Sequence, residues 1–110
     1  MEEEIFLDDF SAPREKESLE IMARAFEVDI NTFEKLKFVV AQYCYENWEG
    51  SSFVLFYKDE DLFENYGSHC SCYGLEGQWA PQETSIEAIK LRLDSDYRFT
   101  PKIKAILKAL

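Results

Sequence analysis

An alternating run of side chains between Phe38 and Glu46 limits the fold of this chain more than any other feature of its sequence. Two sets of residues alternate there, and β-branched and aromatic residues are frequent in both, as strands prefer. One set is Val39, Ala41, Tyr43 and Tyr45, and the other is Phe38, Val40, Gln42, Cys44 and Glu46. The run predicts a strand, and a longer helix over residues 32–47 is the competing interpretation.

Two further segments of the same kind follow at short intervals. Residues 53–58 are apolar at nearly every position, which predicts a central strand buried on both faces, and residues 62–66 form a third predicted strand. Glu49–Ser51 predicts the first turn, and the polar residues 58–61 predict a hairpin loop that lacks the Asn-Gly or Asp-Gly signature. Because short connections join antiparallel neighbours, the three strands should form a meander.

Helical periodicity precedes this centre. Apolar residues recur at helical spacing over about 12–27, with Ser11 as the expected N-cap and Pro13 in the first turn. Asn31 and Glu34 resemble a capping box and predict one further helical turn. The remaining apolar residues near the N-terminus should add an edge strand or pack on the core; they are Ile5, Phe6, Leu7 and Phe10.

Two helices are predicted after the centre. Thr84, with Glu87 three residues later, predicts a capped helix over about 85–94. Thr100 and Pro101 predict the N-cap and first residue of a last helix. Its apolar stripe is Ile103, Ile106, Leu107 and Leu110.

These elements predict one domain over residues 1–110. Residues 1–35 form a helical N-terminal part, residues 36–81 a β-meander with a loop rich in Gly and Cys, and residues 82–110 two C-terminal helices. The expected class is therefore α+β, with an antiparallel three- or four-stranded meander and helices packed on one face.

The chain is strongly acidic, with a net charge of −10. The charge is distributed unevenly along the chain, because residues 1–34 carry a net charge of −8 and residues 82–110 carry a net charge of +2. Direct binding to duplex DNA is not expected, since it requires Lys and Arg to neutralise phosphates. The first residues, Met1–Glu4, are acidic rather than basic and apolar, and no run of 18 apolar residues occurs, so a cytoplasmic protein without a membrane span is expected.

The only histidine and two of the three cysteines lie within four residues. Together with Cys44 from the first strand, His69, Cys70 and Cys72 would make a Cys₃His zinc site, although a C-x-C pair is tighter than the usual spacing. Alternatively, the cysteines pack as small apolar residues and His69 bonds to the backbone. A Cys–His nucleophilic pair is a third hypothesis, but no residue is evident to orient the imidazole. No cofactor is expected, and zinc is the one alternative.

Residues 67–79 read Gly-Ser-His-Cys-Ser-Cys-Tyr-Gly-Leu-Glu-Gly-Gln-Trp, and residues 45–56 contain a second distinctive run. In these two runs the chain resembles a group of small proteins from phages and bacterial genomes, to which no activity is assigned. The resemblance extends over about 36–93. It implies a phage or mobile-element setting and supplies no catalytic residues.

Charge and this implied setting predict a binding protein rather than an enzyme. The expected partner is a host protein that handles nucleic acid or serves in defence, whose basic groove would attract acidic side chains. The chain would then inhibit its partner, in the manner of a DNA mimic or an anti-CRISPR protein. Self-association as a structural component is the alternative. The predicted contact residues are Trp48, Asp59, Glu60, Asp61, Glu64 and Tyr66.

Overall fold

The computed structural model of the protein describes residues 4–110. The first three residues of the acidic start therefore lie outside the described residues. Five strands form one sheet in the order β1-β2-β3-β4-β5, which is also the order of the chain. The strands are β1 (Ile5–Asp8), β2 (Leu36–Glu46), β3 (Glu49–Lys58), β4 (Asp61–His69) and β5 (Gln82–Thr84). The helices are α1 (Glu15–Phe26), the 3₁₀ helix η1 (Ile30–Phe33), α2 (Ile86–Leu91) and α3 (Pro101–Lys108).

The α+β class and the antiparallel meander of β2, β3 and β4 are confirmed. A strand over 36–46 replaces the competing helix over 32–47. The sheet is wider than the expected three or four strands, because a short strand is added at each edge. At one edge β1 pairs parallel to β2, and at the other edge β5 pairs antiparallel to β4.

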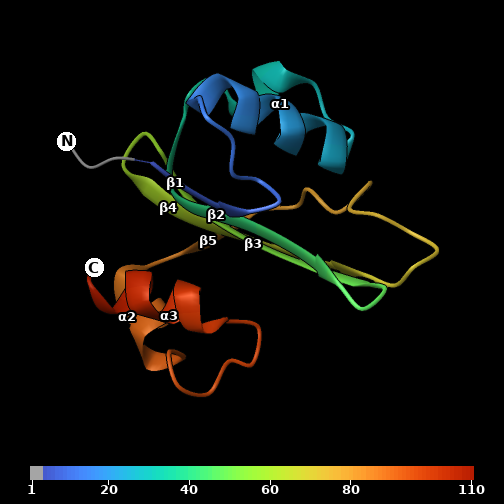
Figure 1. Ribbon diagram of the computed structural model, residues 1–110. Helices are drawn as coiled ribbons and strands as arrows, with labels where there is room; N and C mark the ends of the chain where they lie inside the picture. The colour runs from blue at the N-terminus through green and yellow to red at the C-terminus, as the bar shows by residue number, and fades with distance from the viewer. Residues whose placement is uncertain (1–3) are drawn as a thin grey trace.

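Helices cover both faces of the sheet, so the expectation of helices on one face is wrong. Figure 1 shows α1 above the sheet and α2 with α3 below it. The reason lies in β3, where Val54 and Phe56 pack in the core beneath α1 while Phe53 and Leu55 pack against the C-terminal helices. A strand that is apolar on both faces leaves one face exposed unless helices cover each side.

Several predicted ends are shifted by a few residues. The helix predicted over 12–27 begins after Arg14, which provides no side-chain cap, so Ser11 and Pro13 precede it. Asp29 rather than Asn31 caps η1, and its carboxylate accepts the Asn31 N–H. Ser85 rather than Thr84 caps α2, whereas Thr100 and Pro101 begin α3 as predicted.

The first hairpin turn lies earlier than predicted. Glu46 pairs with Glu49, so Asn47 and Trp48 are the turn residues and Gly50 lies inside β3. Both turn residues have positive φ angles, 52° and 66°. Two such residues define a type I′ turn, whose twist matches that of the strands. Asn tolerates this backbone conformation well, which explains why the turn forms at Asn47.

None of the helices in residues 4–110 is long and apolar enough to cross a lipid bilayer.

Candidate functional site

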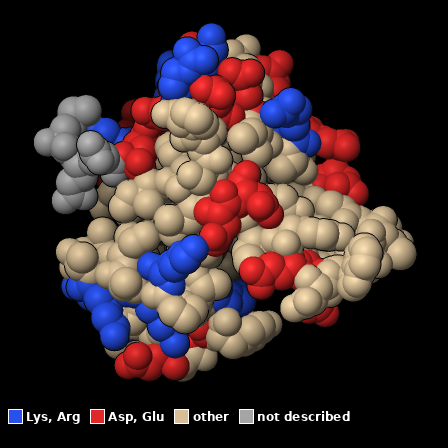
Figure 2. Space-filling view, in the orientation of Figure 1, with Lys and Arg blue, Asp and Glu red and all other residues tan. Residues whose placement is uncertain are grey.

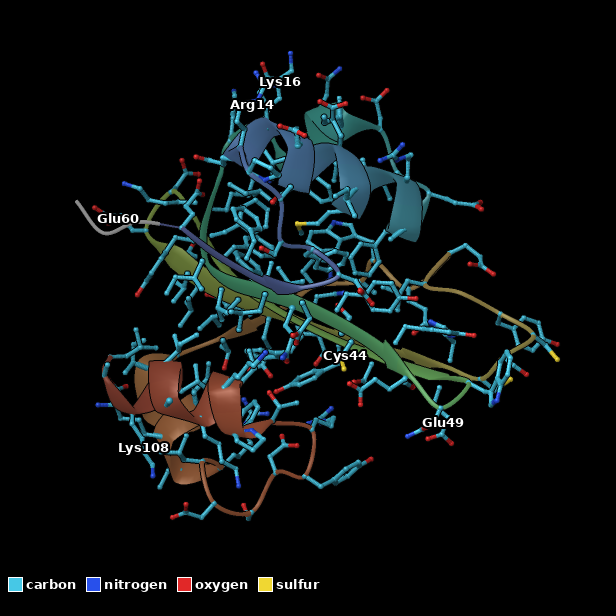
Figure 3. All side chains as sticks on the ribbon, in the orientation of Figure 1. Arg14, Lys16, Cys44, Glu49, Glu60 and Lys108 are labelled. Atoms are coloured by element: carbon cyan, nitrogen blue, oxygen red, sulfur yellow. The ribbon has the colours of Figure 1, made fainter. Side chains whose placement is uncertain are left out.

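The predicted contact residues do not form one surface. Asp59 and Glu60 form the β3–β4 turn, and Trp48 lies in the β2–β3 turn at the other end of the same strand. Figure 3 shows Glu60 and Glu49 at opposite ends of the sheet. We call these the Glu60 end, with residues 58–61 and their neighbours on β2, and the Trp48 end, with residues 43–52 and 66–79.

Glu64 and Tyr66 are committed to interactions inside the fold. Glu64 is 7% exposed and accepts two hydrogen bonds from Arg92, at 2.9 and 2.7 Å. The Arg98 guanidinium lies 3.7 Å from the centre of the Tyr66 ring, and burial raises the pKa of the Tyr66 hydroxyl. Asp96 bonds to both arginines, which lowers its pKa chiefly through Arg98. This network attaches the α2–α3 connection to β4 and leaves neither predicted residue free to contact a partner.

Lysines compensate the acidic residues at the Glu60 end. Lys58 pairs with Asp61 across the hairpin, and the register of β2 against β3 places Lys37 opposite Tyr57. The acidic turn therefore lies in a region of mixed charge.

The Trp48 end, by contrast, is formed by segments without Lys or Arg, although the Arg98 guanidinium reaches its inner edge at Tyr66. Lys58 is the only residue of either type between residues 38 and 89. In Figure 2 no blue atoms lie at the right-hand tip of the molecule, where the Trp48 end projects beyond the helices. Glu46, Glu49 and Glu76 are exposed there.

Three of the four exposed aromatic side chains in residues 4–110 lie at the same end, and the fourth, Tyr97, lies between α2 and α3. Trp48 is 75% exposed, Tyr73 is 70% exposed and Tyr45 is 42% exposed. Trp79 differs from them, because it packs in the core against the rings of Phe26 and Phe33, at 5.1 Å from each. Tryptophan and tyrosine are the residue types most enriched at the centres of protein interfaces.

His69 holds the Trp48 end together. Its Nδ1 lies 2.8 Å from the Cys70 carbonyl oxygen, which can only accept, so Nδ1 carries the proton. When the ring is neutral, Nε2 accepts from the Tyr43 hydroxyl, which lies 2.6 Å away. The ring also stacks on Tyr45, with 5.3 Å between the ring centres. Both ring nitrogens are occupied, and the hypothesis that His69 bonds to backbone fits this geometry.

The four predicted metal ligands are not brought together. Cys44 lies on the face of the sheet that carries α2 and α3, as Figure 3 shows, whereas the His69 ring lies with Tyr43 on the α1 face. Cys70 and Cys72 are exposed in the loop after β4 and do not pack as small apolar residues. Within residues 4–110 no three His, Cys, Asp or Glu side chains are placed to hold a metal ion.

Cys44 is the least accessible thiol. Burial raises its pKa, and the nearby carboxylates of Glu46 and Asp8 act in the same direction. Since the thiolate is the nucleophilic form, this environment makes Cys44 less reactive than an ordinary exposed thiol.

Comparisons with protein-family models, curated proteins and solved structures give no match for this chain. The Trp48 end combines exposed aromatic rings with exposed carboxylates on one part of the surface.

Proposed function

We propose that this chain is a small acidic binding protein that attaches to a basic surface of another protein and blocks it. The observation that carries the proposal is the composition of the Trp48 end, where exposed aromatic rings occur in segments free of Lys and Arg. Such a surface offers a partner both apolar contact area and a negative potential. The contact surface is the Trp48 end, and the predicted residues Asp59, Glu60 and Asp61 serve solubility.

The partner is a host protein that handles nucleic acid or takes part in defence, and binding occurs in the cytoplasm of the host cell. A nucleic-acid-binding groove carries positive charge in order to hold phosphates, so it would attract a chain with a net charge of −10. The resemblance to phage proteins supports this setting. Inhibition then follows from occupation of the groove, and the chain itself binds neither DNA nor membrane.

A pull-down from host lysate tests the proposal. The tagged chain is incubated with lysate treated with nuclease, so that nucleic acid cannot bridge two proteins. The expected result is retention of a basic nucleic-acid-handling protein that is released by added salt, because the attraction is electrostatic. Loss of that protein's activity on addition of the chain would show that binding also inhibits the partner. Recovery of no such protein counts against the proposal.

A further inference from the structure

A cavity lies where the sheet meets the connection between α2 and α3. Figure 1 shows this connection below the sheet, on the side towards the Trp48 end. The cavity has a volume of about 410 Å³, which is within the range of small-molecule sites. Strands and connection both contribute to its lining, which includes Gln42, Ser51, Ser68, Tyr97, Arg98 and Thr100.

The wall that the connection forms is fixed by contacts inside the fold. The Thr100 hydroxyl donates to Oε1 of Gln42 at 3.1 Å, and Gln42 is only 4% exposed. The Arg98 guanidinium lies 3.7 Å from the centre of the Tyr66 ring and donates to Asp96 from Nε and Nη2, at 2.9 and 2.8 Å. These contacts attach the connection to β2 and β4, so the cavity is preformed and a ligand need not order its walls.

The charges around the cavity exclude an ionic ligand. None of the residues that line it in the described part of the chain is Asp or Glu, so a cation would find no carboxylate there. Arg98 is the charged residue of the lining, and its bonds to Asp96 offset that charge. An anion would also be repelled by the net charge of −10. The cavity therefore suits an uncharged molecule.

The polar groups of the lining favour a ligand that carries oxygen acceptors. Ser51 and Ser68 are exposed and lie directly opposite each other on β3 and β4, so their hydroxyls are close together. Within residues 4–110 Asp96 takes the N–H groups of Nε and Nη2 of Arg98, which leaves those of Nη1 for a ligand. Carbonyl and hydroxyl oxygens accept from both kinds of donor.

Tyr97 adds an aromatic surface to the same cavity. Its side chain is 93% exposed, so it contributes little to the core. A tyrosine ring in such a position can stack on a flat ring of a ligand, as aromatic side chains do with unpaired bases.

We propose that this cavity binds an uncharged nucleoside. The base stacks on Tyr97 and its ring carbonyl accepts from Arg98, while the ribose hydroxyls bond to Ser51 and Ser68. A pyrimidine with ring carbonyls fits these donors, and uridine is the simplest example. The site is separate from the proposed attachment to a basic protein, because its lining is neutral and lies against the C-terminal helices.

Nuclear magnetic resonance tests the site by titration of the ¹⁵N-labelled chain with uridine. The expected result is a saturable change in the amide signals of Ser51, Ser68 and Thr100. Uridine monophosphate should bind more weakly than uridine, because it adds negative charge to a ligand of an acidic chain.

Two variants and two matched controls locate the binding. Tyr97→Ala should weaken uridine binding at least about fivefold, the lower end for one base–aromatic stack. Ser68→Phe should abolish it, because the larger ring fills the cavity. The controls make the same changes outside the lining, at Tyr73, which is 70% exposed, and at Ser71, which is also exposed. Tyr73→Ala and Ser71→Phe should change the affinity less than about twofold, as ordinary surface substitutions do.

Unchanged signals at uridine concentrations up to roughly 10 mM would overturn the inference, since that limit corresponds to negligible affinity. Equal losses in Tyr97→Ala and Tyr73→Ala would also overturn it. Equal or tighter binding of uridine monophosphate would overturn the assignment to an uncharged ligand. Because Tyr97 is exposed, its variant keeps the test decisive even if Ser68→Phe does not fold. The pull-down examines a different surface, so its result is independent of these outcomes.

Discussion

The Tyr43 hydroxyl lies 2.6 Å from Nε2 of His69, so β2 and β4 are joined directly over Gly50 of the strand between them. A β-carbon at Gly50 would lie 2.6 Å from Cε1 of His69 and closer still to Nε2. A glycine is therefore required at position 50 to leave room for the imidazole ring, and Gly50 is not a residue of the turn.

Gly50→Ala should destabilise the fold by about 2 kcal/mol, the usual penalty for overpacking a filled site. Urea unfolding measures the change in the free energy of unfolding. The double variant with His69→Ala removes the ring that the new methyl group meets, so Gly50→Ala should then have little effect. An undiminished penalty in that background would mean that His69 is not the cause.

Glu64→Ala should destabilise the fold by about 2 kcal/mol, because it removes the two short hydrogen bonds of the Arg92 guanidinium and leaves only its longer contacts with Asp96 and Tyr66. The Glu64 side chain is 8% exposed and that of Arg92 is 31% exposed. The matched comparison is Arg14→Ala, which breaks an ion pair with Glu17 whose side chains are 82% and 41% exposed. That change should have an effect below about 0.5 kcal/mol. Similar losses for both variants would show that burial does not govern the two pairs.

Glu4 should make stability depend on pH near neutrality. Burial, followed by a hydrogen bond with Glu15, raises its pKa from 4.5 to about 7, while its bond to the Phe38 N–H and the charge of Lys37 act in the opposite direction. Between pH 4.5 and about 7 the Glu4 carboxyl is protonated in the native state and ionised in the unfolded state. The free energy of unfolding therefore falls as pH rises through this window.

Glu4→Gln tests this dependence, because a neutral amide can still accept the Phe38 N–H. The variant should melt roughly 2–4 °C above the wild type at high pH, and at pH below about 4.5 the two proteins should melt alike. Thermal melts across the pH range measure the difference. A constant offset at every pH would assign the effect to packing instead of titration.

Two thiols should react much faster than the third in the native protein. Cys70 and Cys72 are exposed, whereas Cys44 is half-buried and its pKa is raised by burial. Iodoacetamide near neutral pH, followed by mass analysis, should give two rapid additions and a third that is slower by at least about tenfold. Rapid modification of Cys44 would show that its thiol is more accessible to solvent than this structure indicates.

The strands and the last helix could be predicted because their signals are local. Alternation identified β2, apolar residues on both faces identified β3 as central, and Thr100 with Pro101 marked the start of α3. The same apolar pattern in β3 already implied two covered faces, a consequence that the prediction of helices on one face missed.

The site could be predicted only in part. Trp48 was predicted as a contact residue, but its turn was not recognised because Trp replaces the glycine of the usual Asn-Gly pair. Glu64 looked like a surface acid because its partner, Arg92, lies 28 residues later in the chain. Contacts between residues so far apart in the sequence depend on the topology of the fold, which no local sequence pattern reveals. The signal that could have located the site was the absence of Lys and Arg around Trp48.

Site-specific photo-cross-linking in the host cell tests the central claim most directly. A photoreactive phenylalanine analogue is placed at Tyr73, which is exposed at the Trp48 end, or at Glu60 on the opposite end as the control. The account predicts one discrete adduct with a basic protein from position 73, none from position 60, and loss of the adduct when Trp48→Gly is added. An adduct from position 60 alone, or one from position 73 that is unaffected by Trp48→Gly, would contradict it.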